Sequence, residues 1–214
     1  MSSIKLKHAS GNSMAISAPP TNPASNLELK LPATIGTAGQ VLSVDGSGNL
    51  TWIDPAQPSI IVDRYRYNTD TATSDQLLTA WDRNTDGNAN RLPGIVGTGV
   101  THSSGTFSFP STGIWEVKVF TNLLVDGNEY VANVIIKVTS DGSSYNSAAY
   151  ARGGDRNTGV GSVQNTHSCS AMFDITNTTN HKVQIHTDSM GATTVKGDAD
   201  MDLTTLTFIR WGDT

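Results

Sequence analysis

Apolar and polar side chains alternate singly along much of the first 54 residues, which is the pattern of a half-buried β-strand. Two such runs flank a Ser-Gly-Asn turn within residues 1–17 and predict a short hairpin. A proline-rich extended connector follows at 18–23. Residues 26–32 then alternate again, and their apolar side is made by Leu27, Leu29 and Leu31.

A second hairpin is predicted within residues 36–54. There, VLSV and LTWI are two short apolar runs on either side of DGSGN, which is rich in residues that favour tight turns. A segment of this size with so few apolar side chains has no adequate core alone. We therefore expect it to pack beside further copies of itself.

From residue 60 onward the alternating runs are longer and contain aromatic residues. Strands are expected in 60–67, 75–82, 101–125, 129–154 and 161–189, and the last one in 202–211. Asp, Gly, Asn and Ser gather between these runs, above all at 126–128 and 141–144. Regular strands with turn residues between them and no helical period predict an all-β sandwich or jelly roll of about eight strands.

The break DPAQP at 54–58 separates these two compositions. We divide the chain into an N-terminal stem or attachment segment (1–54), a linker (55–59) and a jelly-roll knob (60–214).

Composition favours self-association and excludes several classes of function. Apolar residues make up 36% of the 214 residues, below the roughly 45–50% usual for soluble domains, so a core shared between copies is expected. The formal net charge is −5, which gives no basic field for nucleic acid or an anionic membrane. No apolar run has bilayer length, and MSSIKLKHAS is not a signal peptide. We expect a protein without membrane insertion that is either cytosolic or assembled in a cytosol and exported by lysis.

The sequence offers no strong catalytic or metal-binding motif. Cys169 is the single cysteine and lies in a strand-like run, so it is interpreted as a structural thiol. The five histidines lack zinc-ligand spacing: His8, His102, His167, His181 and His186. No nucleophile elbow, Walker element or dinucleotide fingerprint occurs. We predict no catalytic, cofactor-binding or metal-binding residues, and we expect that the protein is not an enzyme.

For two acidic clusters, cation binding is an alternative to a purely structural role. Residues 82–87, DRNTDG, match the first half of a calcium loop, in which alternate side-chain oxygens surround a hard cation. The last ligand position would be Pro93, and the other interpretation is a plain turn. Asp198, Asp200 and Asp202 also alternate, and solvated edge charge is the interpretation we favour there.

Aromatic residues, Pro and Gly mark the entry to a long strand and the last strand of residues 60–214. They are Phe109, Pro110, Gly113 and Trp115 at the entry, and Phe208 and Trp211 in the last strand. In this pattern, residues 60–214 resemble the globular head of the complement and tumour-necrosis-factor superfamily. The resemblance implies a ten-stranded jelly roll that assembles as a tight homotrimer. The polar loops are richer in Asn and Thr than in that family, and no collagen-like stalk is present.

Three sequence elements follow one another in the first 54 residues, at Ser3–Ser13, Ala18–Ala24 and Leu31–Trp52. In their type and order they resemble stem segments of phage tail-fibre-like proteins. This resemblance implies a virion protein that is assembled in the host cytoplasm and whose stem contacts other virion proteins.

Two classes of function follow from these resemblances. The first is a structural component of a phage virion, which is either a trimeric fibre or fibre tip that adheres to a host-surface glycan or protein, or a capsid decoration of the cement or head-fibre kind. The second is a free carbohydrate-binding adhesion module. For recognition we expect the polar loops at 84–99, 140–147, 153–162 and 189–200, because rigid β-scaffolds present contacts through loops.

Overall fold

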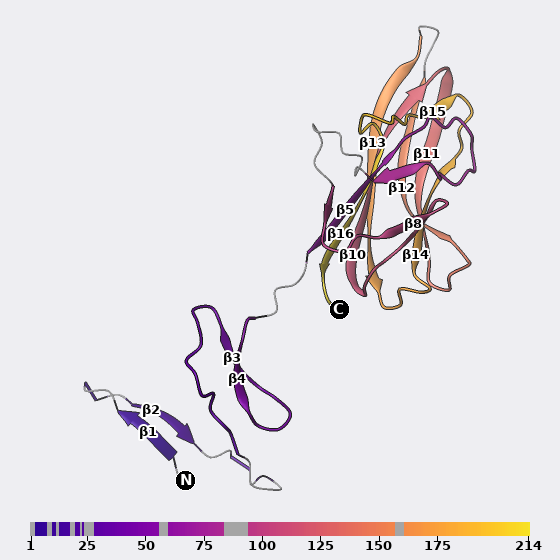
Figure 1. Cartoon of the computed structure of the whole chain (residues 1–214). Coiled ribbons are helices and arrows are strands. Elements are labelled where there is room, and N and C mark those ends of the chain that lie inside the picture. The colour runs from indigo at the N-terminus through magenta and orange to yellow at the C-terminus, as the bar shows by residue number, and fades with distance from the viewer. Residues whose placement is uncertain are drawn as a thin grey trace. The chain divides into compact units, whose positions relative to one another are not determined.

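The computed structural model describes residues 3–7, 10–11, 13–17, 20–21, 23, 28–55, 60–83, 94–156 and 161–214. Every regular element in these ranges is a β-strand (Figure 1). Within them, no helix is long and apolar enough to cross a bilayer. The chain divides into two compact units, unit 1 (residues 1–57) and unit 2 (residues 58–214), which are described separately.

Unit 1 contains the two expected hairpins. In one, β1 (Ser3–Lys7) pairs antiparallel with β2 (Ser13–Ser17), and in the other, β3 (Val41–Val44) pairs with β4 (Leu50–Ile53). Asp45 explains the second turn, because its Oδ1 accepts hydrogen bonds from the backbone N–H groups of Ser47 and Asn49, both at 2.9 Å. The turn residues therefore supply the register of this hairpin.

Unit 1 exposes most of the apolar side chains described in it. Exposed fractions are 64% for Leu29, 78% for Leu31 and 96% for Ile35. Four further side chains on the second hairpin are between 41% and 55% exposed: Val41, Leu42, Val44 and Ile53. Leu27 lies outside the described residues. The strand expected at 26–32 is absent from the described 28–32, where Lys30 makes only an isolated bridge to Asn49.

Unit 2 is a sandwich of two antiparallel sheets (Figure 1). The first sheet runs β13 (Val163–Ile175), β10 (Gly113–Val125), β16 (Thr205–Gly212), β5 (Ile61–Tyr67) and β6 (Trp81–Arg83), with β15 (Thr193–Val195) beside β10 and β7 (Ile95–Val96) beside β5. The second runs β12 (Asn146–Arg156), β11 (Asn128–Thr139), β14 (Lys182–Asp188), β9 (Thr106–Ser108) and β8 (Thr101–Ser103). The all-β jelly-roll prediction is confirmed.

The expected count of about eight strands is too low, because the described part of unit 2 has twelve. The additional strands are two or three residues long: β6, β7, β8, β9 and β15. Such segments are too short to show a period of two in the sequence. Of the strand expected at 75–82, only Trp81 and Asp82 lie in a strand, which is β6.

The core lies between the two sheets and is rich in aromatic rings. Along β10, Trp115, Val117 and Val119 are fully buried, while the alternate residues Lys118 and Phe120 are exposed. Phe208 of β16 is also fully buried, and its ring centroid lies 5.1 Å from that of Phe107. Alternation along the long strands therefore assigns one side chain in two to the core.

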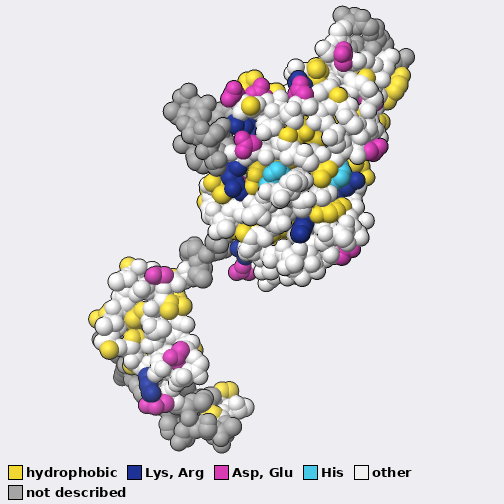
Figure 2. Space-filling model, turned by 45° about the vertical axis from the view of Figure 1, so that its right-hand side comes forward, with side chains coloured by type: hydrophobic (Ala, Val, Ile, Leu, Met, Phe, Trp, Pro, Cys, Tyr) yellow, Lys and Arg dark blue, Asp and Glu magenta, His cyan; other side chains and the backbone are white. Residues whose placement is uncertain are grey.

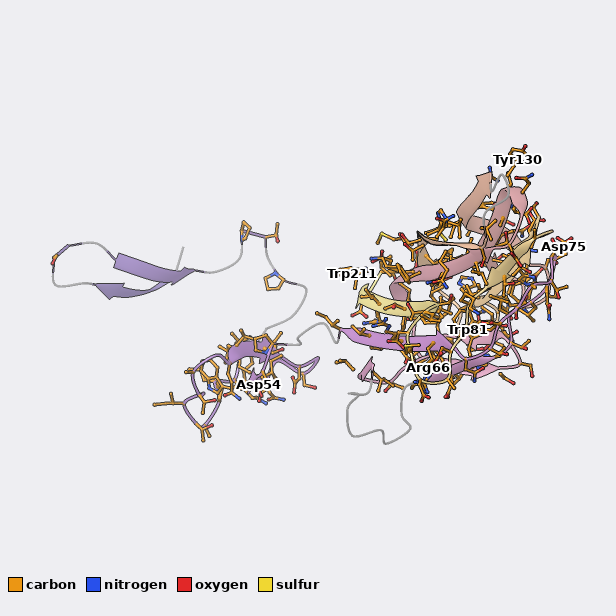
Figure 3. All side chains as sticks on the ribbon, turned by 90° about the horizontal axis from the view of Figure 1, so that it is seen from above. Asp54, Arg66, Asp75, Trp81, Tyr130 and Trp211 are labelled. Carbon is orange, nitrogen blue, oxygen red and sulfur yellow. The ribbon has the colours of Figure 1, made fainter. Side chains whose placement is uncertain are left out.

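The last strand lies in the middle of its sheet, as expected from its apolar residues on both sides. It pairs with β10 on one side and β5 on the other. Arg210 near its end pairs with Ile61 at the start of β5, so the chain enters and leaves unit 2 at the same end. We call this end the base, and the end at the β10–β11 turn around Gly127 the apex. Trp211 at the base and Tyr130 toward the apex are labelled in Figure 3.

Gly113, part of the entry motif, is required by close packing at the base. Its φ angle is +132°, and a Cβ atom there would lie 2.3 Å from the carbonyl oxygen of Gly212. Phe109 and Trp115 of the same motif are buried, with ring centroids 5.0 Å apart. The motif therefore joins the first long strand to the last one.

Candidate binding surface

The first sheet has a face that points away from the second sheet. We call it the open face. Along β10 it carries the residues that alternate with the core: Ile114, Glu116, Lys118, Phe120, Asn122 and Leu124. On β13 the corresponding residues are all exposed: Gln164, Thr166, Ser168, Ser170, Met172 and Asp174.

The open face is chemically mixed. Phe120 is 40% exposed and Met172 65% exposed, and the β13 residues between them are small and neutral. Glu116 and Lys118 form an ion pair at 3.4 Å. Aromatic residues and Met are enriched in protein–protein interfaces, so Phe120 and Met172 are the two residues of this face that favour a contact with another chain. In Figure 2, the charged side chains visible on unit 2 lie in small dispersed groups and form no patch of one sign.

A cavity of about 310 Å³ lies at the base, which we call the base crevice. It is formed where the end of β11 and the start of β12 face the end of β13. Its lining is Val138, Thr139, Ser140, Asn146, Met172, Phe173, Asp174, Ile175 and His181. These residues come from distant parts of the chain, and no sequence pattern indicated that they would meet.

A larger cavity of about 580 Å³ lies at the opposite edge of the sandwich, beside β5, β6 and segment 95–102. Behind it, the fully buried Asp63 accepts two hydrogen bonds from Arg83, at 2.9 and 2.7 Å. Arg83 Nη2 also donates to the Tyr65 hydroxyl and to the Val100 carbonyl oxygen, both at 2.5 Å. The network fastens segment 95–102 to β5.

The titration behaviour of this network suits a structural role. Burial and then the charge of Asp63 raise the pKa of Tyr65 to about 12, so its hydroxyl stays protonated. Burial and Arg83 lower the pKa of His102, whose Nε2 accepts a hydrogen bond from the Gly105 N–H at 2.9 Å. Asp63, Arg83 and Tyr65 bond to one another, His102 bonds to the backbone, and none of the four pairs a nucleophile with a general base. Sequence analysis did not single out Asp63, although its position between the inward Ile61 and Tyr65 was a usable signal.

The remaining candidate chemistry has a structural explanation where the structure describes it. Burial raises the pKa of the Cys169 thiol to about 11, which keeps it protonated and a poor nucleophile. Asp198 Oδ1 caps a turn by accepting from the N–H of Asp200 and Met201, and Asp202 pairs with Arg64 at 3.2 Å. Asp198 therefore supports a turn outside the strands, and Asp202 takes part in an ion pair.

The calcium-loop candidate is described only in part. Asp82 lies 3.6 Å from Arg66, and the ligand positions from residue 84 to Pro93 are outside the described residues, as is His8. In the part of the chain that is described, no three His, Cys, Asp or Glu side chains form a group able to hold a metal ion.

Two of the expected recognition loops are held firmly by carboxylates. Asp141 accepts from the N–H of Ser143 at 2.8 Å and of Ser144 at 2.7 Å, and these bonds lower its pKa. Glu129 Oε2 accepts from the N–H of Gly191 at 2.6 Å and of Ala192 at 2.5 Å. These bonds fix the backbone at 141–144 and at 191–192, within two of the loops expected to take part in recognition.

Comparison with solved structures found proteins with a similar fold. Eiger, a tumour necrosis factor from S. frugiperda, matches with a TM-score of 0.55 and 13% sequence identity, over 74% of this chain and 96% of that one. Unit 2 has a tumour-necrosis-factor-like fold. Murine APRIL crystallised at pH 8.5 matches with a TM-score of 0.47 and 12% identity, over 71% of this chain and 98% of that one.

At the level of sequence, no protein-family model and no curated protein matches the chain. The likeness to Eiger, at 13% identity, concerns the jelly-roll fold alone.

Proposed function

We propose that this protein is a structural, non-enzymatic component of a phage virion: a homotrimer in which unit 1 is the stem that contacts other virion proteins and unit 2 is a knob that adheres to a host-surface glycan or protein. The observation that carries this proposal is the exposure of apolar side chains on unit 1. Leu29, Leu31 and Ile35 are each at least 64% exposed in a single copy. Full burial of one leucine is worth about 1.5–3 kcal/mol, which copies packed side by side would supply.

The tumour-necrosis-factor-like fold and the open face support the same assembly from unit 2. Phe120 and Met172 give this face apolar anchors without a continuous apolar patch. The resemblance of residues 3–52 to phage stem segments supports the assignment to a virion.

Two measurements test the proposal. Sedimentation velocity and mass photometry of the full chain should show one species of three times 22.6 kDa at micromolar concentration. A stable monomer under those conditions would defeat the trimer.

The location is tested separately, by gold-labelled antibody against unit 2 on intact particles in the electron microscope. Label at the tail supports a fibre or fibre tip, and label over the head supports the capsid-decoration alternative. Label on no particle would refute the virion assignment. A chain with residues 1–54 deleted should keep a folded knob and lose incorporation into particles, and normal incorporation would contradict the role given to the stem.

A further inference from the structure

The indole of Trp211 is exposed at the base. Its exposed fraction is 53%, although Trp and Tyr are the side chains that contribute most when they are buried in an interface. Ile60, next to the strand that pairs with this part of β16, is 54% exposed. The base therefore presents a projecting aromatic side chain with an apolar neighbour.

The base crevice matches an indole in size and chemistry. At about 310 Å³ it is at the small end of the roughly 300–1,000 Å³ range of ligand pockets, so it suits one large side chain. Its lining includes the apolar Val138 and Phe173 and the polar Asn146 and Asp174. A buried indole needs an acceptor for its Nε1–H, and residues that carry side-chain oxygens are present in this lining.

Trp211 and the base crevice lie at the same height along the strands. On one side of β10, Trp115 pairs with Arg210 and Ile114 pairs with Gly212, so Trp211 is the extra residue of a bulge between them. On the other side of β10, the same Trp115 and Ile114 pair with Phe173 and Asp174, which line the crevice. Trp211 is not among the residues that line the base crevice of its own copy.

We propose that Trp211 of one copy occupies the base crevice of the next copy. The two contact surfaces are different, so the contact is head-to-tail, and such contacts close into a ring when each copy is related to the next by rotation alone. Equal heights of the projecting side chain and the cavity satisfy that condition for an axis along the strands. This inference rests on the proposed trimer and names the contact that holds its base.

The first test replaces the side chain. Trp211→Ala should raise the dissociation constant of the assembly by about 30-fold, the effect expected for loss of an aromatic anchor, as measured by mass photometry over a dilution series. Tyr130→Ala is the matched control, because Tyr130 is 73% exposed toward the apex and should leave the constant unchanged. A dissociation constant that is equally insensitive to both changes would overturn the contact.

The second test places cysteines on the two surfaces, in a Cys169→Ala background. A chain with both Trp211→Cys and Met172→Cys should oxidise to a covalent trimer on a non-reducing gel, and either substitution alone should give no cross-link. The pair Tyr130→Cys and Met172→Cys should also stay uncross-linked. Self-cross-linking of the Trp211→Cys chain alone would mean a symmetric contact and would refute the head-to-tail arrangement.

The two proposals fail in different ways. A stable trimer that does not cross-link through positions 211 and 172 would overturn the Trp211 contact and leave the proposed trimer standing. A monomer of the unsubstituted chain at micromolar concentration would overturn both.

Discussion

Replacing Phe208 with Ala should destabilise unit 2 more than any change at its surface. The side chain is fully buried, and its ring centroid lies 5.1 Å from that of Phe107, 6.0 Å from Phe109 and 6.4 Å from Tyr65. Three rings in contact with it leave little freedom for the core to collapse into the space that the truncation creates. The cost for such a site is about 3–5 kcal/mol, against a typical total stability of about 5–15 kcal/mol.

The assay is thermal unfolding of the full chain at one fixed protomer concentration, because association contributes to the apparent stability. For a unit of this size, about 2–4 °C is expected per kcal/mol, so the melting temperature should fall by about 6–20 °C. Tyr130→Ala serves as the control and should change stability by no more than about 0.5 kcal/mol. An unchanged melting temperature for Phe208→Ala would show that β16 does not organise the core.

Three further predictions concern buried polar and titratable groups. Asp63→Asn should lower the free energy of unfolding by about 3 kcal/mol in urea titrations, since it leaves the Arg83 guanidinium without its buried carboxylate, and adding Arg83→Gln should restore part of the loss. The Cys169 thiol should react slowly with Ellman's reagent at pH 8 in the folded protein and quickly after denaturation, because burial raises its pKa to about 11; fast reaction in the folded state would contradict its placement. The pKa of His102 is lowered in the fold from 6.5, so the unfolded chain takes up the proton first, and stability should fall as the pH drops from about 6.5 through the folded-state pKa. His102→Phe should flatten this pH dependence in part, and an unaltered slope would exclude His102 as a source of it.

The long strands and their turns could be predicted from sequence because both are local properties. β10, β11 and β13 are 12 or 13 residues long, which gives the period of two room to be recognised. The turns at Asp45 and Asp141 were recognisable because one carboxylate satisfies several backbone N–H groups within four residues. Such bonds form between near neighbours in the chain, so residue order alone reveals them.

The parts that escaped prediction depend on contacts between distant residues. The base crevice brings Val138, Asn146, Phe173 and His181 together, and only the pairing of the strands decides that they meet. Conversely, residues 28–32 alternate like a strand but have one isolated bridge as partner in a single copy. Strict alternation along a strand indicates which side chains share a face. It does not indicate what that face will pack against.

The pairing of Ile61 with Arg210 determines how unit 2 responds to mechanical load. Tension between the entry to β5 and the apex acts along the strand, so the hydrogen bonds joining β5 to β16 are loaded together, in shear. Tension between that same entry and the C-terminus separates β5 from β16 at their adjacent ends. The hydrogen bonds between the two strands are then loaded one after another, in the unzipping direction. If unit 2 is held at the entry to β5 and the external force acts at its apex, the β5–β16 hydrogen bonds are loaded in shear. Shear is the stronger of these two loading directions.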